Sequence, residues 1–336
     1  MAIDVVDQLL EIYPDNPIYV YHEIVHNKHV VERFRKRQVK FVDSIEEVPI
    51  GSLVVFSAHG VSPEVRKQSK LRNLTAIDAT CPLVTKVHIE AIRYAEKGYQ
   101  ILLIGHADHQ EIIGTRGEAP DAIQVVSSTD QIPKLHIDDP NKLVYLTQTT
   151  LGVDDASAII TALRKAFPNI KDPPSDDICY ATTNRQKAVR AIAPECDLVL
   201  VIGSKNSSNS VRLTEIAHAI GTPAYLIDDA TELEEKWFVD VKTTLITAGA
   251  SAPEDLLREV ILQLMQDYGG EVEQHDVFHE NMEFGLPGTL KEFMRSRGVD
   301  PAGRQIVRDD AEAIDSWLLS QDIPHRTVQI TLGQTL

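Results

Sequence analysis

Two cysteines lie in similar sequence contexts and could act as metal ligands. Cys81 closes the segment Asp78-Ala-Thr-Cys, Cys179 closes the segment Asp177-Ile-Cys, and each precedes a predicted helix. A thiolate at the start of a helix is stabilised by the helix dipole, which favours metal binding. A single cysteine is more often a small buried hydrophobic residue, but the repeated context favours ligands. Iron–sulfur clusters usually take four protein ligands, and three would serve if one iron stayed open to a substrate.

The third cysteine, Cys196, is predicted to be structural. It directly precedes the apolar run Leu198–Ile202, which puts it at the amino end of a predicted strand. The polar segments that could form a site follow the strands at their other ends. We therefore do not expect Cys196 to bind a metal.

Histidines gather in segments that follow predicted strands. His26 lies in HEIVHN, His59 in SAHGV, and His106 and His109 in GHADH. A lone histidine is usually a polar surface residue, and the last two could form a zinc pair, but no third ligand follows at a useful spacing. We interpret these histidines as hydrogen-bond donors or cations around a phosphate-bearing ligand.

The segment GSKNSSNS is typical of a diphosphate site. Ser207, Ser208 and Asn209 open the predicted helix Val211–Ile220. Hydroxyl, amide and backbone N–H groups at a helix start suit a diphosphate. One such residue would suffice as an N-cap, and three in succession exceed that need. Ser251 in AGASAP is a similar but weaker case.

Glu111 and Thr149 are candidates for proton transfer. Glu111 follows His109 by two residues, and a carboxyl group among histidines can serve as a proton donor. An acidic residue in the first turn of a helix is also common for stability alone. Thr149 in TQTTL could position a substrate hydroxyl or cap the helix that follows.

Short apolar, β-branched runs alternate with amphipathic helical stretches. Such alternation indicates βαβ units and parallel sheets, hence an α/β fold, in which ligands bind at the carboxyl ends of the strands. The helical stretches include Leu83–Lys97, Ala156–Phe167 and Val211–Ile220. The predicted strands are Ile18–Tyr21, Leu53–Phe56, Ile101–Ile104, Leu143–Leu146, Leu198–Ile202, Ala224–Ile227 and Thr244–Thr247.

The repeat of cysteine contexts divides the chain into modules. We predict α/β modules at residues 1–80, 81–175 and 176–269, followed by a C-terminal extension at 270–336. The extension carries a mixed-charge helical stretch near Asp309–Leu319. The chain opens on the helix-like segment Ala2–Tyr13, and because a βα fold normally begins with a strand, we expect an upstream segment to be missing.

The composition excludes several functional classes. The 336 residues carry 33 Lys+Arg and 50 Asp+Glu, a formal net charge of −17, which argues against nucleic acid as the main partner. No run approaches the roughly 20 apolar residues of a membrane helix, and no secretory signal is visible. Three cysteines do not make a disulfide framework, so we predict a reducing, cytoplasmic location.

The motifs, in their order, resemble the 4-hydroxy-3-methylbut-2-enyl diphosphate reductase family of the non-mevalonate isoprenoid pathway. The resemblance spans about Ala2 to Gly269, and the set of motifs is highly specific. The matching segments are HEIVHN (22–27), FSAHGVS (56–62), DATCPLVTKVH (78–88), GHADHQE (105–111), TQTTL (147–151), DDICYATTNRQ (176–186), GSKNSSNS (203–210) and TAGASAP (247–253).

The resemblance implies three pseudo-equivalent α/β modules around a central 4Fe–4S cluster that three cysteines hold. Two electrons, normally from a ferredoxin or flavodoxin, would remove the substrate's C4 hydroxyl as water, and protonation would yield isopentenyl and dimethylallyl diphosphate. By resemblance, Cys81 and Cys179 are cluster ligands and Glu111 is the proton donor, helped by Thr149. The implied substrate-binding residues are His26, His59, His109, Thr149, Ser207, Ser208, Asn209 and Ser251.

The sequence departs from the family pattern in three places. The first strand and first cluster cysteine are absent, so we expect Met1 to be an internal methionine or the chain to be truncated. The usual proline between His109 and the proton donor is Gln110, which could alter that turn. The tail beyond about residue 290 exceeds the family core. Two alternatives stay open: a cluster-less paralogue that only binds a small diphosphate, and a zinc hydrolase built on the histidines and Glu111.

Overall fold

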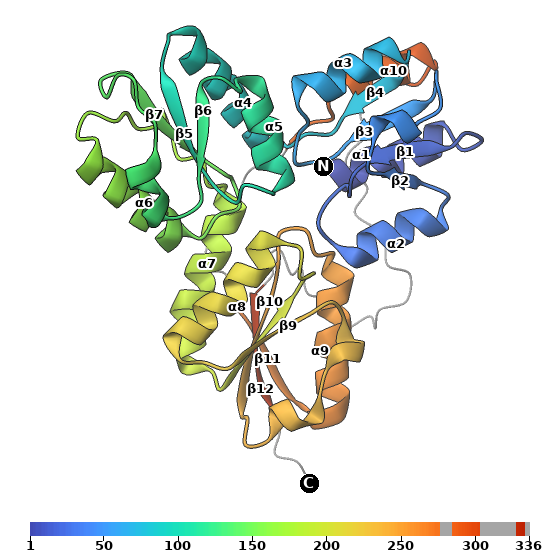
Figure 1. Ribbon diagram of the computed structural model, residues 1–336. Helices are drawn as coiled ribbons and strands as arrows, with labels where there is room; N and C mark the ends of the chain where they lie inside the picture. Colours follow the sequence, from blue (N-terminus) through green and yellow to red (C-terminus); the bar gives the residue numbers. More distant parts are fainter. Residues whose placement is uncertain (276–283, 303–326, 333–336) are drawn as a thin grey trace. The chain divides into compact units, whose positions relative to one another are not determined.

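A computed structural model of the protein describes residues 1–275, 284–302 and 327–332. These residues form two compact units (Figure 1). Unit 1 contains residues 1–25, 31–179 and 284–302, and unit 2 contains residues 26–30, 180–275 and 327–332. The predicted helical stretch near Asp309–Leu319 lies outside the described residues.

The first sheet of unit 1 is parallel and has the strand order β2-β1-β3-β4. Every residue of the inner strand β3 is buried, as a continuous β-branched run predicts for a parallel strand covered on both faces. Helix α10 packs against β4. The elements are α1 (Ala2–Ile12), β1 (Ile18–Tyr21), α2 (Lys28–Lys36), β2 (Lys40–Val42), β3 (Leu53–Phe56), α3 (Pro63–Leu71), β4 (Thr75–Asp78) and α10 (Gly288–Ser296).

The second sheet of unit 1 is also parallel, in the order β6-β5-β7. Successive side chains of a strand point to opposite faces. Leu102 and Ile104 of β5 therefore pack on the α6 side, whereas Ile101 and Leu103 pack on the α4 and α5 side. The elements are α4 (Pro82–Glu96), β5 (Gln100–Ile104), α5 (Gln110–Glu118), β6 (Ile123–Val126), β7 (Leu143–Thr147) and α6 (Val153–Ala166).

Unit 2 is built on a mixed sheet in the order β11-β12-β10-β8-β9. Strands β10, β8 and β9 are parallel, while β12 runs antiparallel to both β10 and β11. One face packs against α9 and the other against α7 and α8 (Figure 1). The elements are α7 (Tyr180–Ile192), β8 (Leu198–Ile202), α8 (Ser208–Ile220), β9 (Ala224–Ile227), β10 (Thr243–Ala248), α9 (Glu254–Tyr268), β11 (Gly270–Gln274) and β12 (Thr327–Leu332).

The three sheets confirm the predicted α/β class with mainly parallel strands. The described part of the C-terminal extension contributes to both units, because α10 belongs to unit 1 while β11 and β12 join the sheet of unit 2. The predicted module boundaries at residues 80, 175 and 269 stay predictions.

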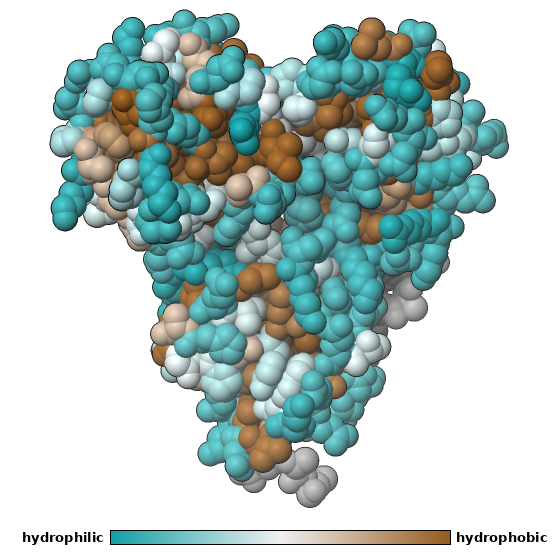
Figure 2. Space-filling model, in the orientation of Figure 1, coloured by the Kyte–Doolittle hydropathy of each residue, from teal (hydrophilic) through white to brown (hydrophobic). Residues whose placement is uncertain are grey.

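Hydrophilic residues cover much of the surface of both units (Figure 2). The large apolar side chains that are exposed lie on separate elements, as is normal for single surface residues. Across the described ranges, no helix is both long and apolar enough to cross a membrane. The exposed large apolar residues are Ile50, Leu71, Ile89, Ile113 and Val239.

Candidate functional site

Cys81 lies at the turn between β4 and α4 in unit 1. Pro82 follows it at the first position of α4, where a residue without an N–H group is well tolerated. Burial raises the pKa of the Cys81 thiol, the N–H groups in the first turn of α4 oppose this, and the charge of Glu111 adds to the rise. A bound metal would overcome this pKa shift, because thiols release their proton on coordination.

Cys179 directly precedes α7, so both cysteines lie at helix starts as their repeated context predicted. The Cys179 N–H donates to the carbonyl oxygen of Thr149 at 2.9 Å. Two residues earlier, the buried carboxylate of Asp177 accepts the N–H of Thr147 at 2.9 Å and the ammonium of Lys86 at 2.9 Å. The turn that carries Cys179 is thus fixed to the end of β7 and to α4.

Lys86 connects the elements that carry the two cysteines. Besides Asp177, its ammonium donates to the carbonyl oxygens of Ser175 at 2.9 Å and Asp176 at 3.0 Å. Helix α4, which starts beside Cys81, is therefore joined to the segment before Cys179 through one side chain. Our sequence interpretation assigned no role to Lys86, although it lies within the repeat.

Glu111 and Thr149 form a buried pair in unit 1. The Thr149 N–H donates to Oε1 of Glu111 at 2.6 Å, and its hydroxyl lies 3.0 Å from Oε2. Burial raises the pKa of Glu111 to about 7, against the opposing hydrogen bonds from Thr149. Because the backbone N–H can only donate, Oε1 must accept. The acidic proton therefore belongs on Oε2, beside the threonine hydroxyl.

His59 and His109 lie near this pair. Their rings meet edge to face, with centroids 5.8 Å apart. Nδ1 of His109 accepts the N–H of Glu111 at 3.2 Å and caps α5, so the ring proton belongs on Nε2. Gln110 occupies the first position of α5, where proline is also favoured. The replacement of the usual proline is therefore compatible with this helix start.

The His88 side chain is a further polar group of this region that our sequence interpretation missed. Its Nδ1 lies 2.8 Å from the Glu118 carboxylate, which also binds Arg66 at 2.7 Å. Burial opposes ionisation of Glu118, but these two bonds outweigh it and lower the pKa of that carboxyl. A Cβ at Gly60 would lie 3.1 Å from the His88 ring, and one at Gly114 would lie 3.4 Å away. The ring thus packs against both the loop of His59 and α5. The sequence feature that could have indicated it is a polar residue on the apolar face of α4.

Cys196 lies where the sequence predicted, ahead of β8 and among apolar side chains. Burial, with help from the neighbouring acidic residues, raises the pKa of its thiol to about 11. Within the ranges that the structure describes, no three His, Cys, Asp or Glu side chains are grouped to hold a metal ion. The assignment of Cys81 and Cys179 as cluster ligands stays a prediction, and Cys196 is the one other thiol among the described residues.

Unit 2 holds the serine- and asparagine-rich loop between β8 and α8. Ser207 caps α8, Ser208 is the first helical residue, and Asn209 is buried. Both atoms of the Asn209 side-chain amide lack a hydrogen-bond partner among the described residues. Buried polar groups almost always have a partner, so this amide is suited to bind a ligand at the helix N-terminus.

Glycines shape the same loop. A Cβ at either Gly203 or Gly249 would overlap with the hydroxyl of Ser210. That hydroxyl donates to Ser207 at 3.0 Å. Only glycine allows the strand ends of β8 and β10 to approach the start of α8 this closely.

Ser251 and His26 are also brought together in unit 2. The Ser251 hydroxyl donates to the backbone carbonyl of His26 at 3.0 Å. Ser251 is thus engaged in fixing the His26 backbone in addition to any contact with a ligand. Its role and those of the other predicted site residues stay predictions.

The predicted site residues fall into two sets, one in each unit. Six of them lie in unit 1: Cys81, Cys179, His59, His109, Glu111 and Thr149. The other five lie in unit 2: His26, Ser207, Ser208, Asn209 and Ser251.

Comparisons with known proteins agree on one family. The family described as "LytB protein" matches residues 1–265. A 4-hydroxy-3-methylbut-2-enyl diphosphate reductase of Rhodopirellula baltica is 51% identical over 293 residues, covering 87% of this chain and 92% of its own. The namesake from Acidothermus cellulolyticus is 49% identical over 310 residues, covering 92% and 91%.

Solved structures give the same result. The E-1-hydroxy-2-methyl-but-2-enyl-4-diphosphate reductase of Plasmodium falciparum is 36% identical, with a TM-score of 0.83 over 88% of this chain and 94% of its own. A structure of (E)-4-hydroxy-3-methyl-but-2-enyl diphosphate reductase is 30% identical, with a TM-score of 0.58 over 79% and 93%. From its sequence and its fold, the chain belongs to the LytB protein family.

Proposed function

We propose that this protein is an oxidoreductase that converts 4-hydroxy-3-methylbut-2-enyl diphosphate to isopentenyl and dimethylallyl diphosphate. The reaction consumes two electrons and two protons, removes the allylic hydroxyl as water and forms one C–H bond. The observation that carries the proposal is the buried pair of Glu111 and Thr149, in which the N–H and the hydroxyl of Thr149 lie 2.6 and 3.0 Å from the two carboxyl oxygens. Burial also raises the pKa of Glu111 to about 7. The family and the names of its members support this assignment.

The proton donor is Glu111, through its Oε2 atom. The N–H of Thr149 fixes Oε1, and the Thr149 hydroxyl adjoins Oε2. The acidic proton of Glu111 and the hydroxyl of Thr149 therefore lie next to each other. A positioned acid of this kind contributes roughly 100-fold to 10,000-fold to a rate. The imidazoles of His59 and His109 would supply further hydrogen-bond donors to the substrate.

We assign a 4Fe–4S cluster as the cofactor, with Cys81 and Cys179 as two of its ligands. When bound, such a cluster supplies electrons and a Lewis-acidic iron. Neither cysteine forms a disulfide, which fits a reducing compartment such as the cytoplasm. A ferredoxin or flavodoxin is the proposed electron donor.

The diphosphate would bind in unit 2. The unpartnered amide of Asn209, the N-terminus of α8 and the hydroxyls of Ser207 and Ser208 provide donors for its oxygens. Ser251 and His26 complete this set. The combination of a buried amide and a helix start is what an anion requires.

The test is to purify the chain anaerobically and to measure its iron, its acid-labile sulfide and its turnover with reduced methyl viologen. Bound iron together with formation of both products would support the reductase. Binding of pyrophosphate without iron or turnover would instead support the alternative, a paralogue that only binds a small diphosphate.

A further inference from the structure

The segment His26–Val30 belongs to unit 2, although the residues on both sides of it belong to unit 1. Asn27 is buried and its side-chain oxygen accepts the N–H of Val30 at 3.0 Å. This bond caps the start of α2 and fixes the turn that follows His26. Further contacts of the segment come from residues that follow β8, β9 and β10, three neighbouring strands in the sheet of unit 2.

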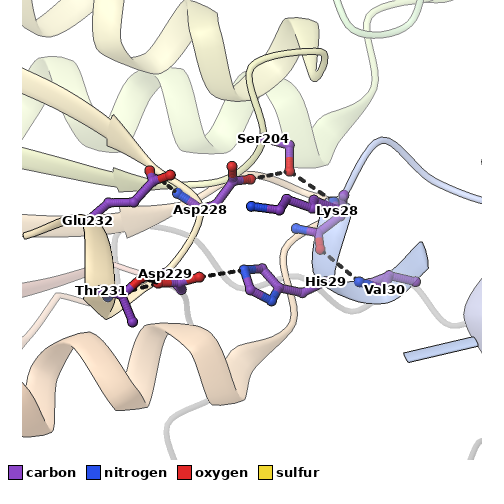
Figure 3. Close-up of polar contacts among 9 residues, drawn as sticks. Lys28, His29, Val30, Ser204, Asp228, Asp229, Thr231 and Glu232 are labelled. Carbon is purple, nitrogen blue, oxygen red and sulfur yellow. Dashed lines mark hydrogen bonds and ion pairs between the residues drawn. The ribbon is translucent and has the colours of Figure 1, made fainter. Parts of the chain in front are cut away.

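Ser204, which follows β8, binds the backbone of the segment through its own hydroxyl. Its hydroxyl accepts the N–H of Lys28 at 3.0 Å and donates to Asp228 at 2.5 Å (Figure 3). Asp228 is itself fixed, because its N–H donates to Glu232 at 3.0 Å. With its proton committed to Asp228, the Ser204 oxygen is oriented as an acceptor for the segment.

Asp229, which follows β9, contacts the side chain of His29 in the segment. Its carboxylate lies 2.9 Å from Nε2 of His29 and accepts the N–H of Thr231 at 2.8 Å (Figure 3). Burial opposes ionisation, but the bonds from Thr231 and the nearby His29 lower the pKa of Asp229. The carboxylate is therefore charged at neutral pH and attracts the imidazole.

The same loop serves the segment and the anion site. The N–H of Ser207, the residue that caps α8, donates to the carbonyl oxygen of Ser204 at 2.9 Å. Ser251, after β10, donates to the carbonyl of His26. The His26 carbonyl and the Lys28 N–H are thus both bound by residues of the loops that carry the proposed diphosphate ligands.

We propose that Ser204 and Asp229 are positioning residues that hold His26 in the diphosphate site of unit 2. Ser204 fixes the backbone two residues after His26, and Asp229 fixes the side chain of His29. Together these contacts fix the position of the turn that carries His26. The inference rests on the diphosphate site of the proposed function. It does not depend on a cluster or on reduction.

The experiment measures the affinity of the purified full chain for inorganic pyrophosphate by calorimetry. Asp229→Asn, which removes the charge beside His29, and Ser204→Ala, which removes the acceptor of the Lys28 N–H, should each raise Kd by about fivefold. The control is Asp43→Asn, which removes the carboxylate of another histidine–aspartate pair, His22–Asp43, in which Asp43 is almost fully exposed. It should leave Kd within about twofold of wild type.

A double substitution separates positioning from general stability. If Asp229 acts through His26, Asp229→Asn should have no further effect on Kd in a His26→Asn background. A purely structural role would lower Tm and leave the Kd of the folded protein unchanged. If Asp229→Asn does not fold, His29→Leu removes the same contact from a side chain that is 26% exposed.

Unchanged pyrophosphate affinity in the Ser204 and Asp229 variants, with binding by the wild type intact, would overturn this inference alone. Failure of the wild type to bind pyrophosphate would overturn the diphosphate site as well. A full additional loss in the His26→Asn background would show that Asp229 does not act through His26.

Discussion

The Glu111 carboxyl of unit 1 and the Asn209 amide of unit 2 differ in whether their polar atoms have hydrogen-bond partners. In unit 1 the Glu111 carboxyl has both oxygens beside donors of Thr149, and Asp177 is bound by Thr147 and Lys86. In unit 2 the buried amide of Asn209 lacks a partner among the described residues. Groups that transfer protons gain from being oriented before the substrate arrives, whereas groups that recognise an anion must keep their donors for it.

The largest expected effect concerns the cysteines of unit 1. Cys81→Ser or Cys179→Ser should abolish iron binding and turnover, because a serine hydroxyl is a poor cluster ligand. Iron and sulfide per chain and product formation measure this. Pyrophosphate affinity, which we assign to unit 2, should not change.

The matched control is Cys196→Ser. This thiol lies among apolar side chains with a pKa of about 11, so its replacement should retain iron and turnover. Iron loss in this variant would mean that the ligand assignment is wrong.

The next effect concerns the amide of Asn209. Asn209→Ala should weaken pyrophosphate binding by roughly tenfold to a hundredfold, because hydrogen bonds to a charged group are lost. In the ligand-free protein the same change should leave Tm unchanged or raise it, because it removes a buried polar group without a partner. A lower Tm together with normal affinity would contradict the contrast between Glu111 and Asn209.

The pH dependence of stability tests unit 1. The folded pKa of Glu111, about 7, lies above its ordinary 4.5, so the folded protein keeps a proton that the unfolded chain releases. The stabilisation is complete below about pH 4.5 and is lost as the pH rises to 7, a decrease of about 3 kcal/mol. Urea unfolding between these pH values measures it, and Glu111→Gln should remove this part of the slope. An identical slope in the variant would show that Glu111 titrates normally.

The smallest effect concerns His88, whose ring packs against both Gly60 and α5. His88→Leu should lower kcat by roughly threefold to tenfold through loss of its bond to Glu118, and His88→Asn, which keeps a donor near Nδ1, should restore part of it. His136→Leu, at an exposed position, is the control. Equal kcat in the Leu and Asn variants would exclude a role for the bond.

The strands were predictable where apolar β-branched residues form an unbroken run. Ile18–Tyr21, Leu53–Phe56, Leu198–Ile202 and Ala224–Ile227 have the predicted bounds. The strands β2 and β4 were not predicted, because they are short and contain polar residues. Pairing of β11 with β12 joins segments far apart in the chain, and no local pattern indicates it.

The part of the candidate site that could be predicted consists of residues whose types and neighbours in sequence already indicate a function. The contexts of Cys81 and Cys179 and the Ser/Asn-rich loop are local patterns. The bond from Ser251 to the His26 carbonyl and the contacts of Lys86 are not, because they depend on which loops meet in the folded chain. A lysine in an amphipathic helix usually lies at the surface.

The most direct test of the account measures turnover and pyrophosphate affinity in one preparation of Glu111→Gln, with Glu96→Gln, an exposed carboxyl on α4, as the control. Glu111→Gln should lose turnover by about 100-fold or more while its iron content and pyrophosphate affinity stay those of wild type. Glu96→Gln should match wild type in all three. Normal turnover in Glu111→Gln, or loss of pyrophosphate binding together with turnover, would contradict the assignment of proton transfer to unit 1 and anion binding to unit 2.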